Sequence, residues 1–463
     1  MSDLFTSLNF ATRALEAQRF ALDVTGHNIA NVNTPGYSRR AVDFSAVPPD
    51  NPRDAGRGVE VAGIRAQRDR LTDRRLGQES SGAEREAAIA DLLGLAEIAL
   101  GTDGQGIDKR LNEFFDSVAK LADAPTSAVA RQQVVQQGSA VASAFHDASS
   151  RLAALQRDAD RRVVTTVDEI NAITDRLAVI NNALSGMPEN GSALQLQDEQ
   201  GTLIRQLSTL VDITVIERNE GGLDIDVAGG RALVVGGTSV DLAAVPTGAN
   251  GRVEVSSAGV TITSQLTGGR LGGVLRARDM HIPDYIAQLD AQAFEFANAV
   301  NAVHSAGFGL DGTTNQNFFA FSTPPVGSAG AAAALIVDPA VTADINRVAA
   351  GEAALPGDNR AARALANLRN EPILDGGTAT FADKWGQLVF SVGRDVQTAT
   401  SETTLRKQIV LQLETLRDQV SGVSLDEEAM NLVKFQRAYE ANARFFQVID
   451  ETLEALMMTV GRS

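Results

Sequence analysis

Apolar residues recur at every seventh position at both ends of the chain. At the C-terminus the first apolar stripe comprises Leu425, Leu432, Tyr439, Phe446, Leu453 and Val460, and a second stripe, three residues further on, comprises Phe435, Asn442, Ile449 and Leu456. At the N-terminus the two stripes comprise Met1, Leu8, Leu15, Leu22 and Ile29, and Leu4 and Ala11. Strict seven-residue spacing is typical of a coiled-coil seam. Because a helix without a packing partner is only marginally stable in water, each end is predicted to pack against the other end, against another subunit, or against both.

Between the two ends, the pattern predicts long helices, then strands, then helices again. Helical spacing extends over residues 83–100, 108–122, 127–185, 193–210, 284–306 and 379–420. Apolar and polar residues alternate over 211–265, between pairs of glycines, which predicts a small antiparallel β-domain. Weaker alternation over 41–65 predicts short strands or an extended arm.

A helix stop follows the N-terminal heptads, within the segment Asn33-Thr34-Pro35-Gly36-Tyr37. Pro35 has no N–H group and disfavours helix at Thr34, and Gly36 tolerates a positive φ. The chain is therefore predicted to leave the helix and reverse its direction here.

This order of segments predicts a mainly α chain with an inserted small β-domain. The fold is expected to be elongated and nested, with the terminal heptad helices paired as a coiled coil, a long-helix bundle inside them, and a β-rich tip. The predicted domains are a terminal coiled-coil and assembly domain with an extended arm (1–69 and 422–463), a long-helix bundle (70–210, 266–310 and 379–421), the inserted β-domain (211–265), and a loop-rich excursion (311–378) with one helix at 359–369.

Composition excludes several classes of function. The 463 residues carry a net charge of −17, and a nucleic-acid or anionic-membrane binder would need a basic face. There is no cysteine, so no disulfide and no Cys-based metal site is expected. No stretch reaches the roughly 20 apolar residues of a membrane span, and no cleavable secretion signal is expected at the N-terminus.

No catalytic, cofactor or metal site is predicted. The four histidines, His27, His146, His281 and His304, lack metal-ligand spacing and are interpreted as surface or capping residues. In the C-terminal heptads, Asn442 is expected to set the helix register, and Glu440 and Arg444 are expected to form an i,i+4 ion pair. The chain is therefore not expected to be an enzyme.

Two terminal segments carry a family resemblance. The segment from Gly26 to Arg39, which ends in Thr34-Pro35-Gly36-Tyr37-Ser38-Arg39, closely resembles the N-terminal signature of the bacterial flagellar axial proteins, which comprise rod, hook and hook-associated proteins. The segments 421–432 and 435–443 are similar to the C-terminal signature of that family. The shorter segments 58–61, 271–275 and 317–320 extend the resemblance over nearly the whole chain. The Tyr37-Ser38-Arg39 ending is more similar to the hook-associated members than to rod or hook proteins.

The resemblance implies a structural subunit that forms a ring at the junction of the flagellar hook and filament. Implied partners are further copies of the chain, the hook protein, the next hook-associated protein towards the filament, and a cytoplasmic export chaperone that covers the C-terminal helix. The implied location is extracellular, in the flagellum, after export without signal cleavage. The residues that the heptads and the resemblance place at the assembly interface are Leu8, Leu15, Leu22, Asn28, Ile29, Asn31, Asn33, Pro35, Gly36, Tyr37, Leu425, Leu432, Phe435, Tyr439, Asn442, Phe446, Ile449, Leu453 and Leu456.

Three other interpretations fit the sequence less well. A hook or distal-rod subunit of the same family is disfavoured by the Tyr37-Ser38-Arg39 ending and by the large helical middle of the chain. A cytosolic coiled-coil scaffold would keep the heptads but would need neither the Asn-rich turn nor the inserted strands. An enzyme hidden in the β-domain would need a nucleophile, a base or a cofactor loop, and the sequence offers none.

Overall fold

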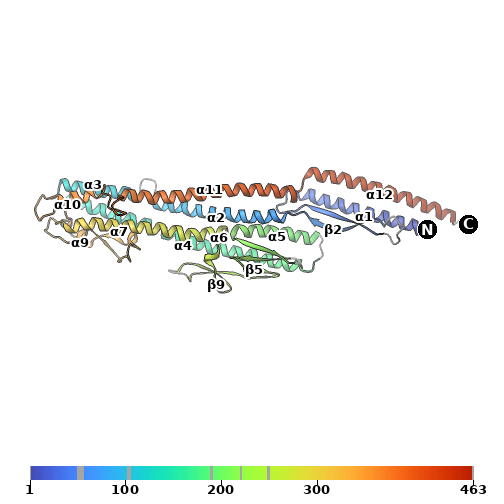
Figure 1. The fold of residues 1–463 in the computed structure, drawn as a ribbon, viewed down its shortest axis with the longest axis horizontal. Coiled ribbons are helices and arrows are strands. Elements are labelled where there is room, and N and C mark those ends of the chain that lie inside the picture. Colours follow the sequence, from blue (N-terminus) through green and yellow to red (C-terminus); the bar gives the residue numbers. More distant parts are fainter. Residues whose placement is uncertain are drawn as a thin grey trace. The chain divides into compact units, whose positions relative to one another are not determined.

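The computed structural model describes residues 2–48, 57–101, 106–187, 191–218, 222–247 and 251–460 of the chain. Its helices are α1 (Ser2–Ala30), α2 (Arg70–Leu100), α3 (Ile107–Asp123), α4 (Ala128–Leu184), α5 (Gly191–Leu210), α6 (Gly269–Arg276), α7 (Ile282–Ala306), α8 (Ala331–Ala334), α9 (Pro339–Ala343), α10 (Arg360–Asn367), α11 (Phe381–Ser421) and α12 (Leu425–Val460) (Figure 1). Its strands are β1 (Arg40–Ala46), β2 (Val59–Ala66), β3 (Ile213–Glu217), β4 (Leu223–Val227), β5 (Arg231–Val235), β6 (Thr238–Ser239), β7 (Leu242–Val245), β8 (Glu254–Ser257), β9 (Val260–Thr261), β10 (Phe319–Phe321) and β11 (Leu335–Val337). The prediction of a mainly helical chain with small antiparallel sheets is confirmed.

Residue contacts divide the chain into two compact units. Unit 1 comprises Met1–Gly82, Glu169–Leu242 and Leu405–Ser463, and unit 2 comprises Ala83–Asp168 and Ala243–Thr404. The borders between the units fall within α2, α4, β7 and α11. The four-part domain division that the sequence suggests stays a prediction.

Two long helices begin where polar side chains satisfy their first N–H groups. Asp69 Oδ1 accepts hydrogen bonds from Leu71 N and Thr72 N, at 3.0 and 3.2 Å, so α2 begins 13 residues before its predicted start at 83. At the start of α11, Thr380 Oγ1 accepts from Asp383 N, and Asp383 Oδ2 accepts from Thr380 N. This reciprocal pair is a capping box, and α11 begins within two residues of its predicted start.

The strands of residues 213–261 form two sheets and are not a tip. One sheet has the strand order β3-β4-β5-β6 and the other β7-β8-β9. The first sheet attaches to α4 through Asn181, whose Nδ2 donates to Leu223 O and Gly236 O and whose Oδ1 accepts from Leu223 N. The predicted β-rich tip is wrong, because β3–β6 cluster with the terminal helices in unit 1 and Glu217 of β3 pairs with Arg70 at the start of α2.

The core of unit 2 contains a cluster of phenylalanines from five separate segments. Their ring centroids lie 4.8–6.4 Å apart, mostly edge-to-face or tilted, which is a favourable geometry for aromatic pairs. The members are Phe114, Phe115, Phe145, Phe296, Phe318, Phe319 and Phe381. Gly138 of α4 admits the ring of Phe318, because a Cβ there would lie 2.6 Å from the ring edge. These seven phenylalanines therefore serve as the core of unit 2.

Residues 311–378 contain more structure than the sequence pattern predicts. Strands β10 and β11 pair antiparallel, α8 and α9 are short helices, and α10 occupies most of the predicted 359–369 helix. The buried Arg131 guanidinium donates to the carbonyl oxygens of Val348 and Pro125 and so ties α4 to this region. The prediction of a surface or capping role is wrong for His304, which is 1% exposed. Its Nδ1 donates to Gln316 O, and its Nε2 accepts from Ala349 N.

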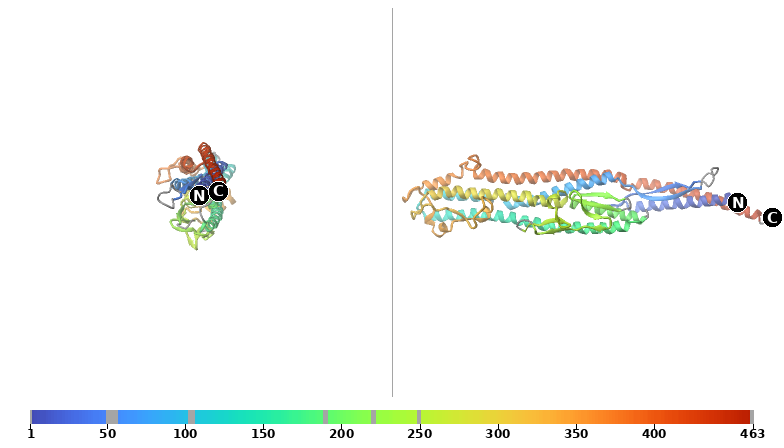
Figure 2. Two further views of the ribbon diagram at one scale, coloured as in Figure 1. Left: turned by 90° about the vertical axis from the view of Figure 1, so that its right-hand side faces the viewer. Right: turned by 60° about the horizontal axis from the view of Figure 1, so that its bottom comes forward.

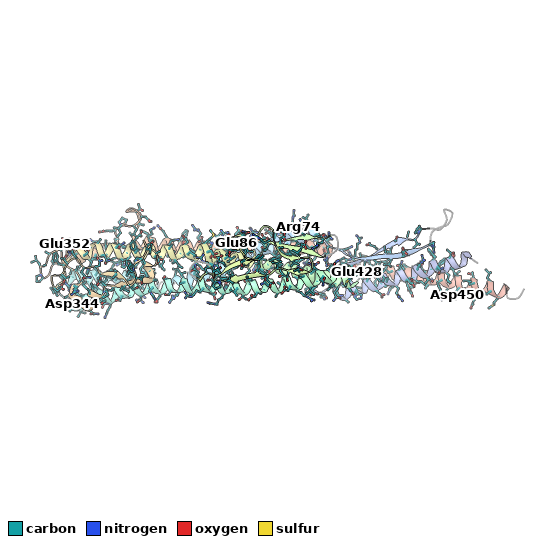
Figure 3. The ribbon with its side chains drawn as sticks, turned by 90° about the horizontal axis from the view of Figure 1, so that it is seen from below. Arg74, Glu86, Asp344, Glu352, Glu428 and Asp450 are labelled. Atoms are coloured by element: carbon teal, nitrogen blue, oxygen red, sulfur yellow. The ribbon has the colours of Figure 1, made fainter. Side chains whose placement is uncertain are left out.

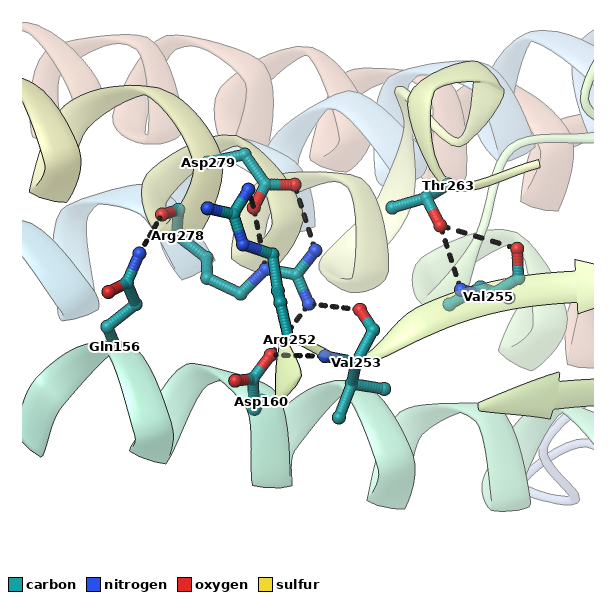
Figure 4. A network of polar contacts seen from close by, with 8 residues as sticks. All are labelled: Gln156, Asp160, Arg252, Val253, Val255, Thr263, Arg278 and Asp279. Atoms are coloured by element: carbon teal, nitrogen blue, oxygen red, sulfur yellow. Dashed lines mark hydrogen bonds and ion pairs between the residues drawn. The ribbon is translucent and has the colours of Figure 1, made fainter. Parts of the chain in front are cut away.

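A short π-helix, η3 (Ala277–His281), joins α6 to α7 in unit 2. Arg278 at this point has a fully buried guanidinium, which donates to Asp160 Oδ1 at 2.8 Å, to Val253 O at 2.6 Å and to Asp279 Oδ1 at 2.7 Å (Figure 4). Gly273 of α6 allows close packing on α2, since a Cβ there would clash with the Arg85 carbonyl. A Cβ at the neighbouring Gly272 would clash with the backbone of Thr267, so both glycines of the segment 271–275 are required by close packing.

Candidate functional site

The first component of the candidate site is the turn that ends α1. Asn31 Nδ2 donates to His27 O at 2.9 Å, and Asn31 Oδ1 accepts from Thr34 Oγ1 at 3.1 Å. Gly36 has φ +84°, and a Cβ there would clash with Thr202 Oγ1 of α5. The predicted helix stop is thus confirmed, and it needs glycine both for its backbone conformation and for its approach to α5. Asn33 and Pro35 are exposed on the same turn.

Asn28, in the last turn of α1, is the centre of the site. Its side chain is 1% exposed and uses its full hydrogen-bonding capacity. The Nδ2 group donates to Arg40 O at 2.9 Å and to Glu428 Oε2 at 3.2 Å. The Oδ1 atom accepts from Tyr37 OH at 2.8 Å and from Arg40 N at 3.0 Å. One amide therefore connects α1, the turn, the first strand and α12.

Glu428 joins the C-terminal segment to this cluster. Its side chain is 2% exposed, and Oε1 accepts from Arg39 Nε at 2.7 Å. Arg39 also pairs with Glu427 at 2.8 Å, and its backbone N–H donates to Ser421 O. A buried carboxylate that loses its cation is costly, by about 3–5 kcal/mol. The N-terminal and C-terminal signatures are therefore held together by a charged contact across 389 positions of sequence.

Tyr37 and Arg40 extend the cluster towards α5. Burial raises the pKa of the Tyr37 phenol, so this group stays protonated and donates to Asn28. The Arg40 guanidinium lies over the Tyr37 ring, 5.2 Å from its centroid, and also faces Asp198 at 3.6 Å. Asp198 accepts a second contact from Arg68 at 2.6 Å. We call the group Asn28, Tyr37, Arg39, Arg40, Glu427 and Glu428 the terminal lock.

The terminal helices α1 and α12 lie side by side in unit 1, with the lock at one end of the contact (Figures 1 and 2). The N-terminal part of α1 lies beside the C-terminal part of α12. Near one end of the contact the ring of Phe10 packs on that of Phe445, with centroids 6.0 Å apart, and at the other end Asn28 donates a hydrogen bond to Glu428. The pair is therefore antiparallel. Figure 3 labels Glu428 and Asp450 towards the two ends of α12.

The buried face of α1 is made of small side chains and not of the predicted leucines. Helix α1 contacts α12 and the antiparallel pair of strands β1 and β2. The buried residues of α1 are Ala11, Ala14, Ala17, Ala21, Val24, Thr25 and Asn28, all at most 7% exposed. The predicted stripe, Leu8, Leu15, Leu22 and Ile29, lies beside this face and is only half-buried. Small side chains on this face let the backbones of α1 and α12 approach each other closely. The leucine stripe keeps part of its apolar area exposed.

The predicted assembly residues of α12 also differ in how far they are buried. Ile449 is 6% exposed, and Leu432, Phe435, Asn442, Phe446 and Leu453 are half-buried. Leu425, Tyr439 and Leu456 are exposed, at 53%, 38% and 40%. Met1 lies outside the described residues, as do the side chains of Leu4 and Val460. The assembly role of this whole set stays a prediction.

Two predictions about polar residues of α12 change. Asn442 is half-buried, and its side chain makes no hydrogen bond to a described residue. The buried polar contact between the two helices is made by Asn28 and Glu428. The predicted ion pair between Glu440 and Arg444 is wrong, because the charged atoms of these two described residues do not come within 4.0 Å of each other. Sequence reasoning missed Arg39, Arg40, Glu427 and Glu428 as site residues. Arg39, Glu427 and Glu428 lie within the two terminal signatures, and Arg40 directly follows the first of them.

A small polar cavity lies below the lock. Residues of the turn, α2, α5 and the end of α11 line it, including Tyr37, Asp73, Arg205 and Ser421. Burial raises the pKa of Asp73 and lowers that of Arg205. The cavity volume is about 50 Å³, which admits a few waters but is far below the 300–1,000 Å³ of a typical cofactor site.

The described part of the chain shows neither a metal-binding cluster nor a membrane-spanning helix. That part holds no group of three or more His, Asp or Glu side chains that could bind a metal ion. None of its helices combines the length and apolarity that a membrane span requires. The described contacts of the site are hydrogen bonds and ion pairs that join α1, the turn and α12.

Comparisons with known families agree with these positions. The model for the flagellar hook-associated protein FlgK helical domain matches residues 95–319. The model for the flagellar basal body rod FlgEFG protein C-terminal region matches residues 418–458, and that for the flagella basal body rod protein matches residues 8–37. The two terminal matches cover α1, the turn and α12, which are the segments that the terminal lock joins.

Whole proteins and a solved structure are also similar. Flagellar hook-associated protein 1 of Bacillus subtilis (strain 168) is 28% identical over 509 aligned positions, covering 100% of this chain and 99% of the relative. The protein of that name from Escherichia coli (strain K12) is 24% identical, covering 97% and 99%. The flagellar hook junction protein FlgK from Burkholderia pseudomallei shares the fold, with a TM-score of 0.67, 16% identity, and coverage of 75% of this chain and 100% of that one.

The B. subtilis alignment is longer than this chain, so the relative carries residues that have no counterpart here. Even so, the matches extend over both ends and the helical middle. The two terminal signatures, their physical connection, the helical-domain match and the full-length relatives together support flagellar hook-associated protein 1 as the family that this chain resembles.

Proposed function

We propose that this protein is a structural subunit of the bacterial flagellum that forms the junction between hook and filament and allows the filament to assemble. The observation that carries the proposal is the terminal lock. It joins the two signature segments, Gly26–Arg39 and 421–443, through Asn28, Arg39 and Glu428. The names of the full-length relatives, flagellar hook-associated protein 1, support the same role.

The proposed assembly is a ring of copies of this chain. The α1–α12 pair would form the packing unit, with the hook protein on one side and the next hook-associated protein on the other. The half-buried leucine stripe of α1 and the exposed Tyr439 and Leu456 of α12 support contacts beyond the single chain. We infer that the lock sets the spacing of the two helices so that neighbouring copies meet one uniform surface.

We also propose export without signal cleavage, with a chaperone covering the C-terminal helix before assembly. The outer half of α12 exposes large apolar side chains, including Phe445 (42%), Val448 (58%), Met457 (71%) and Met458 (69%). Large exposed apolar side chains of this kind promote self-association unless a partner covers them. This supports a protective partner in the cytoplasm and burial against other subunits in the flagellum.

We propose no enzymatic activity. A hook or distal-rod subunit remains the second candidate, because the terminal matches at residues 8–37 and 418–458 belong to rod-protein families. The helical-domain match at 95–319 favours the junction. A cytosolic scaffold would not need the lock.

The deciding experiment is a deletion strain viewed by electron microscopy, with flagellin measured in the medium. Hooks without filaments, together with shed flagellin monomers, would support the junction. Loss of the hooks would move the protein to the hook or rod, and normal filaments would refute a flagellar assembly role. A copy carrying Leu453→Asp is expected to fold in its helical middle, to be exported, and to leave the filaments absent, because it puts a charge on the half-buried seam.

A further inference from the structure

The outer faces of α1 and α12 carry complementary rows of charge. On α1 the row is Glu16, Arg19 and Asp23, and on α12 it is Arg437, Glu440 and Arg444. The signs are minus, plus, minus on the first helix and plus, minus, plus on the second. Both rows have steps of three and then four residues, so each occupies one face of its helix.

Each row lies opposite the seam that joins the two helices. At 100° per residue, Glu16, Arg19 and Asp23 lie on average about 170° from the buried positions Ala14 and Ala21. All six charged side chains are exposed. None of them forms an ion pair with another described residue. The rows therefore face away from the partner helix of their own chain.

We propose that the outer charged face of α1 binds the outer charged face of α12 in the next copy of this chain. This proposal rests on the proposed function, and it names the surface through which the copies in the ring meet. In a closed ring every copy has the same orientation. Because α1 and α12 are antiparallel within one chain, α1 of one copy is also antiparallel to α12 of its neighbour.

The antiparallel arrangement brings opposite charges together along the whole row. Aligning Glu16 with Arg444 places Arg19 beside Glu440 and Asp23 beside Arg437. The exposed Val433 and Val448 flank the row on α12, and the half-buried Leu15 and Leu22 flank it on α1, so apolar area is available on both sides. This resembles a coiled-coil contact in which charged flanking positions select the partner and the register.

The alternating signs also disfavour wrong contacts. Two α1 faces, or two α12 faces, brought together in the same register would place like charges opposite each other, which is unfavourable. A heterotypic contact between α1 and α12 therefore fits the charges, and a contact between two like helices does not. A heterotypic contact is also the type that generates a ring.

The test is a charge exchange in the deletion strain, complemented with the full chain. Glu16→Arg with Asp23→Arg makes the α1 row entirely positive, and Arg437→Glu with Arg444→Glu makes the α12 row entirely negative. Each double variant is expected to lower the fraction of cells with filaments by about tenfold or more, because attractive contacts become repulsive. The quadruple variant restores complementarity and is expected to recover most filaments.

A matched control reverses two charges elsewhere on α12. Asp450 and Glu454 are exposed, with no described ion-pair partner, and Asp450→Arg with Glu454→Arg is expected to leave the filaments within twofold of the unmodified chain. Thermal unfolding of the purified variants followed by circular dichroism, and immunoblots of the culture medium, separate assembly defects from misfolding and from failed export.

Three outcomes would overturn the proposal. The double variants could assemble normally, or the quadruple variant could remain as defective as the doubles, which would mean that the charges meet another component. The Asp450 and Glu454 control could also be as defective as the doubles. The deletion strain without a complementing copy tests the proposed function by itself. If that strain keeps its filaments, the proposed function is wrong, whatever the charge variants do.

Discussion

Asn28→Asp tests whether the terminal lock holds α1 to α12. The substitution keeps the size of the side chain but replaces the Nδ2 donor with a carboxylate oxygen. This oxygen would take the position of Nδ2, 3.2 Å from Glu428 Oε2, where both side chains are buried. A hydrogen bond between the helices becomes a repulsion between two carboxylates.

The size of the effect follows from the geometry. Two unit charges 3.2 Å apart repel by about 5 kcal/mol at an effective dielectric constant of about 20. The Arg39 guanidinium attracts both carboxylates and offsets part of this repulsion, whereas loss of the bond to Arg40 O adds about 1 kcal/mol. We expect the closed state of the α1–α12 pair to lose about 3–5 kcal/mol.

The assay is hydrogen–deuterium exchange of peptides from α1 and α12. A loss of about 3 kcal/mol in local stability corresponds to about 100-fold faster exchange. Asn33→Asp makes the same chemical change on the exposed turn and is expected to leave exchange unchanged. Glu428→Gln added to Asn28→Asp is expected to restore protection, since the Gln amide donates to the new carboxylate while Glu427 still pairs with Arg39. Equal exchange in the Asn28 and Asn33 variants, or no recovery with Glu428→Gln, would refute the reasoning.

Three further predictions concern single positions. Gly36→Ala forces a side chain into a positive-φ turn against α5. It is expected to lower the free energy of unfolding by about 1–3 kcal/mol, measured as a lower Tm. Its control, Gly26→Ala, places the methyl group in open space and is expected to be neutral or slightly stabilising. Gly138→Ala pushes a methyl group into the phenylalanine cluster and is expected to cost about 1–3 kcal/mol in urea unfolding, against a neutral Gly94→Ala on an open helix face. Burial lowers the pKa of His304 to about 4, below its unfolded value of about 6.5. As the pH drops, the unfolded chain therefore binds a proton at this histidine before the folded chain does. The free energy of unfolding is expected to fall by on the order of 3 kcal/mol between pH 6.5 and pH 4. His304→Gln is expected to make the free energy of unfolding depend less on pH across that range. An unchanged pH dependence would mean that His304 is not the group responsible.

The sequence by itself determined the elements and the ends of the chain. Heptad spacing, the Pro35–Gly36 stop and the change to alternation near residue 211 are local signals, because each depends on neighbours within a few positions. These signals placed α1, α3, α4, α7, α11 and α12 within about three residues of their observed bounds. The start of α2 was missed, because its cap at Asp69 stands among charged residues with no apolar period.

The tertiary structure alone decided which faces are buried and which distant residues meet. A heptad pattern on α1 fits its leucines and its alanines equally well, and only packing against α12 selects the alanine face, since small side chains let the helices approach. The bond from Asn28 to Glu428 spans 400 positions, so no local pattern predicts it. His304 is similar: its spacing resembles that of a surface residue, and only the fold of residues 311–351 around it removes it from water.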